Sequence, residues 1–133
     1  MSNKNKADFS KYLMLIALIC LMAGGYIISR KKMQLREAAR LPFYKVEISD
    51  IKDGKYNGIT ETSFLHLELE IEIENQKIKE IKVLRNDGLD GEKARPIISE
   101  MIAQNKIIVP AIKGAERGSL VYISCASTAL AGK

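Results

Sequence analysis

The chain has 133 residues, of which 47% are hydrophobic and 28% charged, a composition that predicts one folded domain with an additional segment. Its formal net charge of +5 is unevenly distributed: residues 1–40 hold eight Lys/Arg against two acids, and residues 41–133 hold thirteen against fourteen. A C-terminal part without a positive surplus lacks the electrostatic surface that nucleic-acid binding requires, so we exclude nucleic acid as a partner.

After a basic tail (residues 1–11), residues 12–29 contain no charge and approach the roughly 20 residues that cross the apolar core of a bilayer. A cleaved signal peptide, with Ala23-Gly24-Gly25 as cleavage site, is the alternative. The apolar run continues through Tyr26-Ile27-Ile28 and ends at Arg30-Lys31-Lys32, like the flank of a stop-transfer segment. We therefore expect a single-pass anchor in the cell membrane.

The side of the membrane does not follow from the flanking charges alone. Three Lys precede the apolar run and five Arg/Lys follow it within a dozen residues, a distribution that favours a cytoplasmic C-terminal domain. Residues 30–42 are expected to form a juxtamembrane helix and linker that ends at Leu41-Pro42, because proline disfavours helix in the residue before it. The domain then comprises residues 43–133.

The first half of the domain is expected to be an antiparallel meander. Residues 43–48 are interpreted as a short strand, and a second strand follows the turn at Asp53-Gly54. Residues 64–75 alternate Leu and Ile with His66 and four Glu, the period-two pattern of a strand with one buried and one solvated face. Residues 78–84 complete a sheet of about four strands.

The second half of the domain is expected to supply two helices. Residues 93–106 carry apolar side chains at helical spacing, with Pro96 in the first turn. Residues 119–131 are ambiguous between strand and helix, and we assign them to helix from the spacing of Ile123, Ala126 and Leu130. The predicted fold class is α+β, a small antiparallel sheet with two helices packed on one face.

The composition argues against a metal centre and against a hydrolase. Cys20 lies in the apolar run and Cys125 near the C-terminus, so a disulfide is not expected. With His66 as the sole histidine, the chain has no recognisable zinc motif and no set of nucleophile, base and orienting acid. His66 and the glutamates of its strand are interpreted as a solvated face, and we assign no catalytic or metal-binding residue.

Two motifs carry a resemblance to a known family. Asp53, Gly54, Tyr56 and Gly58 match a turn of the form Asp-Gly-x-Tyr-x-Gly, and residues 113–119 match a Ser-Gly-Ala-Thr motif with a Ser three residues on. In this order, over about ninety residues and behind a membrane helix, they resemble the FMN-binding domain family. That family is typified by the flavin-carrying domains of the sodium-pumping NADH:quinone oxidoreductase and of the Rnf electron-transport complex.

The chain departs from the family at positions that support covalent flavin. The threonine that carries FMN through a phosphoester is Glu116 here, the serine of the motif is Lys113, and an upstream aspartate is Pro110. A carboxylate offers no hydroxyl for such an ester. Reversible phosphate binding is physically possible, because helix N-terminal N–H groups attract anions and two cations flank the turn. The candidate cofactor-binding residues are Lys113, Gly114, Ala115, Glu116, Arg117 and Ser119.

The resemblance implies a membrane-anchored FMN-binding module that transfers electrons with non-covalent FMN, outside the cytoplasm, beside other subunits of a membrane redox complex. The alternative is a flavin-free structural or interaction subunit of a membrane complex. In that case Glu116 complements the helix dipole while Lys113 and Arg117 are solvated. The sequence favours an electron-transfer or accessory subunit over an independent enzyme.

Overall fold

The computed structural model describes residues 2–132, with side chains for residues 8–132. The chain divides between Met33 and Gln34 into two compact units, an N-terminal helical unit and a C-terminal α+β unit. Each is described by itself. Helix α1 (Ser2–Ala39) forms the first unit and contributes its last residues to the second.

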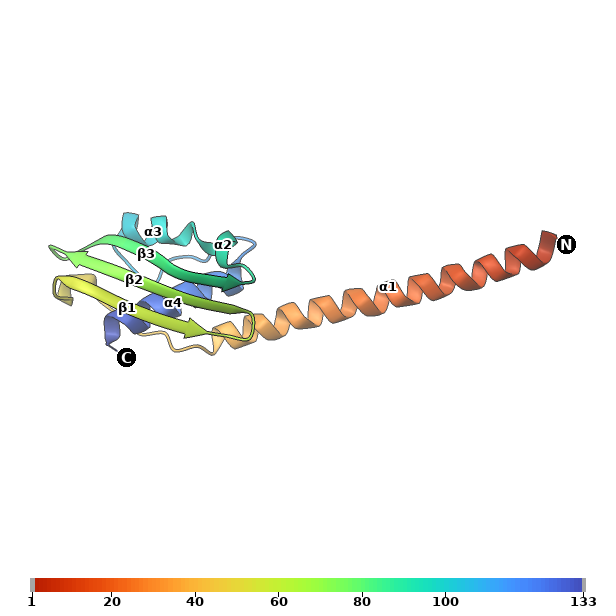
Figure 1. The fold of residues 1–133 in the computed structure, drawn as a ribbon, viewed down its shortest axis with the longest axis horizontal. Helices are drawn as coiled ribbons and strands as arrows, with labels where there is room; N and C mark the ends of the chain where they lie inside the picture. Colours follow the sequence, from red (N-terminus) through yellow and green to blue (C-terminus); the bar gives the residue numbers. More distant parts are fainter. Residues whose placement is uncertain (1, 133) are drawn as a thin grey trace. The chain divides into compact units, whose positions relative to one another are not determined.

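The N-terminal unit is a helix whose apolar side chains are exposed. Helix α1 (Figure 1) contains, from Asp8 onward, an 18-residue window of mean hydropathy 2.2. None of this window is buried. This length and composition suffice to cross a bilayer, although a signal sequence near an N-terminus has the same properties. The helix ends at Ala39, as expected from the proline at position 42.

The C-terminal unit is built on a three-stranded antiparallel sheet in the order β1-β2-β3 (Figure 1). The leucine and isoleucine side chains of the central strand are no more than 1% exposed, which confirms the alternation seen in the sequence. Their neighbours on the opposite face are Glu and His side chains. The strands are β1 (Gly54–Glu61), β2 (Leu65–Glu74) and β3 (Lys77–Gly88).

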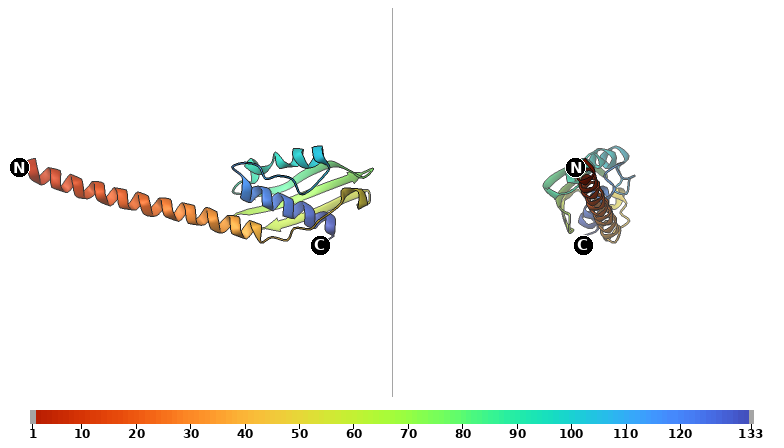
Figure 2. Two further views of the ribbon diagram at one scale, coloured as in Figure 1. Left: turned by 180° about the vertical axis from the view of Figure 1, so that it is seen from behind. Right: turned by 90° about the vertical axis from the view of Figure 1, so that its right-hand side faces the viewer.

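Helices cover one face of the sheet, so the fold class is α+β. The long C-terminal helix packs on β1 and β2, and the preceding helix packs on β3 (Figure 2). The four helical segments of this unit beyond α1 are η1 (Ile48–Asp50), α2 (Gly91–Ala94), α3 (Ile97–Gln104) and α4 (Glu116–Ala131).

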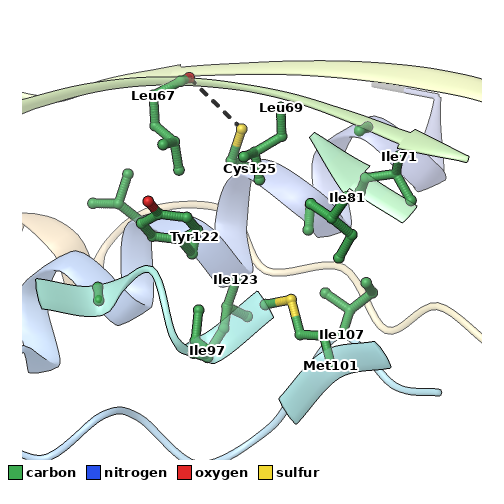
Figure 3. Close-up of a cluster of buried hydrophobic side chains, with 14 of the residues drawn as sticks. Leu67, Leu69, Ile71, Ile81, Ile97, Met101, Ile107, Tyr122, Ile123 and Cys125 are labelled. Carbon is green, nitrogen blue, oxygen red and sulfur yellow. Dashed lines mark hydrogen bonds between the residues drawn. The ribbon is translucent and has the colours of Figure 1, made fainter. Parts of the chain in front are cut away.

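The core lies between the sheet and these helices (Figure 3). Leu67 and Leu69 of β2 face Tyr122 and Cys125 of α4, all fully buried, and Met101 of α3 closes the cluster from the opposite side. The thiol of Cys125 donates to the carbonyl oxygen of Leu67 at 3.7 Å. Helix α4 is buried along nearly its whole length, which settles the ambiguity of residues 119–131 in favour of helix.

The expected strand at residues 43–48 does not form, so the sheet has three strands rather than about four. Side chains of α4 bind this segment instead of a neighbouring strand. Ser127 Oγ accepts the N–H of Tyr44 at 3.2 Å, and Ser124 Oγ donates to the carbonyl of Pro42 at 2.7 Å. These bonds provide partners for backbone groups that a sheet would otherwise have paired.

The predicted helix at residues 93–106 is interrupted. Its beginning belongs to α2, and α3 starts only at Ile97, after Arg95 and Pro96. Proline has no N–H to donate, and a helix accommodates it only in the first turn. A new helix therefore begins after Pro96. Strand β3 also extends to Gly88, beyond residue 84, where the predicted strand ends.

Candidate functional site

The turn before α4 is held together by Ser119. Its hydroxyl is fully buried, donates to the carbonyl oxygen of Ala115 at 2.8 Å and accepts the N–H of Ile112 at 2.9 Å. Gly114 has φ 88°, the left-handed region that favours glycine, and a Cβ built there would have no heavy atom within 4 Å. The turn is therefore open to solvent at Gly114, and Ser119 has a structural role.

Glu116 supplies the anion at the N-terminus of α4. The residue at the cap position, Ala115, has no side-chain hydrogen bond, and Glu116 Oε1 accepts the N–H of Gly114 at 3.1 Å. This bond, together with the N–H of Glu116 itself, lowers the pKa of the Glu116 carboxyl. The chain thus places its own carboxylate against N–H groups that would otherwise attract a phosphate.

Arg117 points away from the turn, into an ion pair. Its Nε donates to Asp90 Oδ2 at 2.6 Å, and the two side chains are only 13% and 10% exposed. The same guanidinium donates to Gln34 Oε1 and lies over the ring of Phe64, 5.9 Å from its centroid. Arg117 therefore joins α4 to the loop after β3 and to the end of α1.

Lys113 is the remaining cation of the motif. Its side chain is exposed, and no carboxylate oxygen of residues 8–132 lies within 4.0 Å of its ammonium group. The structure therefore brings Lys113, Gly114 and Glu116 together on one exposed turn. Of the other predicted site residues, Arg117 is directed to Asp90, and Ser119 is buried within the turn that it holds.

Three residues of the first motif serve the fold. Asp53 Oδ1 accepts the N–H of Asn75 at 3.0 Å and so holds the β2–β3 turn, while the hydroxyl of Tyr56 donates to the carbonyl of Lys52 at 2.7 Å. Gly58 allows α4 to approach β1, because a Cβ there would lie 2.5 Å from the carbonyl oxygen of Cys125. Packing and turn geometry therefore explain these three residues of the motif.

The outer face of the sheet carries paired charges. His66 lies between Glu61 and Glu68, at 3.6 and 3.1 Å, and Lys79 binds Glu74 at 2.9 Å. The hydrogen bond from Lys79 to Glu74 raises the pKa of the lysine. Among the described residues no cluster of His, Cys, Asp and Glu has the geometry to hold a metal ion.

Two hollows in the C-terminal unit lie apart from the motif. One hollow, of about 380 Å³, is lined by Phe43 and by the segments Lys45–Ile48 and Asn105–Ile108. The other, of about 290 Å³, lies between β1 and the end of α4, next to Asn57 and Thr128. Neither is lined by residues 113–119.

Comparison of the chain with protein-family models, with curated proteins and with solved structures found no match. The resemblance to FMN-binding domains thus rests on the two motifs, and it stays a prediction. Sequence reasoning missed Asp90 and Gln34 as the partners of Arg117. The only signal at Asp90 is the Asp-Gly pair that it forms with Gly91, which indicates a turn but not a salt-bridge partner.

Proposed function

We propose that this chain is a single-pass membrane protein whose C-terminal domain has the architecture of an FMN-binding module and serves as a flavin-free interaction subunit of a membrane complex. The anchor is supported by the length and hydropathy of α1 and by its exposed apolar side chains. Placement of the domain outside the cytoplasm is supported only by the family resemblance, and the flanking charges favour the opposite side.

The flavin-free interpretation depends chiefly on the engagement of Arg117 by Asp90. A phosphate clamp needs cations that are free to reach the anion, and Arg117 is bound elsewhere in a largely buried pair. Glu116 adds to this, because its carboxylate accepts the N–H of Gly114 and repels a phosphate. Without a threonine at this position, the covalent ester of the family has no attachment point.

Reversible FMN binding is the second candidate, and a specific observation favours it. Lys113 is exposed and unpaired within residues 8–132, and the space beside Gly114 is open. A phosphate could approach the turn from this side and bind Lys113. In that arrangement the flavin would supply redox chemistry, and the chain would hold its phosphate only weakly.

Flavin titration separates the two candidates. The full chain, purified in mild detergent, is expected to be colourless and to give no saturable quenching of FMN fluorescence up to high micromolar flavin. Glu116→Thr removes the competing carboxylate and serves as the variant most able to gain binding. Saturable quenching by the wild type that weakens about tenfold in Lys113→Ala would establish the flavin candidate instead.

The interaction role has its own readout. The chain, extracted from native membranes in mild detergent, is expected to migrate in a native gel as part of a larger complex. Migration as a free single chain would contradict the interaction role whatever the flavin result.

A further inference from the structure

The end of α1 and the residue that follows it carry a concentration of positive charge that has no ion-pair partner among residues 8–132. We call residues 30–40 the basic segment. Its one acid, Glu37, accepts hydrogen bonds from the backbone N–H and the hydroxyl of Ser63. No carboxylate oxygen among residues 8–132 lies within 4.0 Å of the segment's cations. The cations are all exposed: Arg30, Lys31, Lys32, Arg36 and Arg40.

The basic segment has two different faces. Gln34 and Glu37 bind Arg117 and Ser63 of the C-terminal unit, and Ala38 is fully buried. Lys32, Arg36 and Arg40 recur every four residues, so by helical geometry they form a stripe on another face. Like charges at this spacing destabilise a helix, and a bound anion relieves their repulsion.

This stripe begins where the apolar run ends. Ser29 is the last residue of that run, and at 1.5 Å per residue Lys32 and Arg36 follow it at about 5 and 10 Å along the helix axis. The polar headgroup layer of a bilayer is about 5–7 Å deep, and charges act over about 8 Å in physiological salt. Tyr26, which packs against Arg30 at 5.6 Å, is the kind of aromatic residue that lies at this interface.

We propose that the basic segment binds anionic phospholipid headgroups at the membrane surface from which α1 emerges. The proposal rests on the membrane anchor proposed above and is independent of flavin. Charge complementarity and continuity with the apolar run favour a lipid surface over an acidic protein. Met33 and Leu35, which are 67% and 41% exposed, add apolar surface suited to the headgroup boundary.

The native cysteines allow a direct test in the full chain. Cys20 is exposed on the apolar part of α1 and Cys125 is buried, so a thiol-reactive donor dye labels one position within the membrane segment. The labelled protein is reconstituted into vesicles of phosphatidylcholine and phosphatidylglycerol that contain a trace of acceptor-labelled lipid of either kind. Energy transfer then reports which lipid is enriched around the helix.

The wild type is expected to enrich the phosphatidylglycerol acceptor at least about threefold over the phosphatidylcholine acceptor, and this preference should weaken as salt is raised. The variant Lys32→Gln/Arg36→Gln/Arg40→Gln is expected to lose most of that preference. A matched control, Lys52→Gln/Lys77→Gln/Lys106→Gln, removes the same charge and is expected to retain it. The three control lysines are exposed and lie next to residues that form or bind the β2–β3 turn. The basic segment binds Ser63 instead, which lies near the opposite end of β2.

Three results would overturn the proposal, and they have different meanings. Equal transfer to both acceptors, from protein that stays in the vesicles after an alkaline wash, refutes lipid recognition and leaves the cations for an acidic protein partner. Release of the protein by the wash refutes the membrane anchor itself. An unchanged preference in the stripe variant would also contradict the assignment to these residues.

Discussion

Arg117 is a charged residue of a candidate binding motif whose side chain is largely buried in the fold. In the sequence it flanks a candidate anion site, but in the fold its guanidinium lies between Asp90, Gln34 and the ring of Phe64. Lys113, four residues earlier, has no such partner among residues 8–132. The two cations therefore differ in what they contribute to stability.

Replacement of Arg117 by alanine is expected to lower the free energy of unfolding by about 3 kcal/mol, because it leaves the Asp90 carboxylate largely buried without its partner. Lys113→Ala is the matched control and should change stability by less than about 0.5 kcal/mol. Urea unfolding of the full chain in mild detergent, followed by circular dichroism, measures both. Equal effects of the two substitutions would show that the Arg117–Asp90 pair does not form.

Among the elements, the β2–β3 hairpin has the least favourable turn chemistry. Its two turn residues, Asn75 and Gln76, have φ 52° and 63°. Two-residue hairpin turns with positive φ at both positions favour Asn followed by Gly, and only the first position conforms. The turn is nevertheless held from outside, since Asp53 accepts the N–H of Asn75 and the Asn105 amide donates to the Gln76 carbonyl.

Gln76→Gly is expected to raise the free energy of unfolding by about 1 kcal/mol, because glycine adopts the left-handed conformation without the steric cost of a side chain. The bond from Asn105 is retained, since it involves the backbone carbonyl of Gln76. Lys77→Gly, one residue later in β3, should instead destabilise by roughly 0.5–1 kcal/mol. The denaturant midpoints of the two variants must move in opposite directions for this account of the turn to hold.

At the scale of the whole molecule, the core contains two ionisable groups that are buried from solvent. Burial raises the pKa of the Tyr122 phenol to about 12 and that of the Cys125 thiol to about 11. The Tyr122 hydroxyl donates to the carbonyl of Gly91 at 2.8 Å, which also favours its protonated form. Both groups therefore stay neutral in the folded chain at pH values where the unfolded chain ionises.

The fold is expected to lose stability in alkali over a defined range. Both pKa values are raised on folding, so the stabilisation is complete below about pH 9 and decreases as pH rises toward 11 for Cys125 and 12 for Tyr122. Between pH 9 and 11, the free energy of unfolding of Cys125→Ala should decrease by roughly 2–3 kcal/mol less than that of the wild type. Cys20→Ala, which changes an exposed thiol, is the control. Parallel stability curves for the wild type and Cys125→Ala would contradict a buried, neutral thiol.

The sequence by itself determined the features that depend on local pattern. The uncharged run at residues 12–29 predicts a long apolar helix, and α1 contains it. The alternation after Phe64 predicts a strand with one buried face, and β2 has that face. Both patterns are periodic within one element, so they need no knowledge of distant neighbours. The α+β class followed from the order of such elements.

Only the tertiary structure decided features whose partners are distant in the chain. Residues 43–48 have strand-like composition, but no strand forms there. Two serines of α4, more than 80 positions away, bind the backbone at Tyr44 and at the preceding Pro42. Arg117 finds Asp90 at a separation of 27 positions, which removes it from the candidate phosphate site. No local periodicity encodes such pairings, because they depend on which buried polar groups the packed elements bring within hydrogen-bonding distance. The same dependence explains why Asp53, Tyr56 and Arg117, which belong to two motifs that resemble a cofactor site, form hydrogen bonds to other parts of the fold.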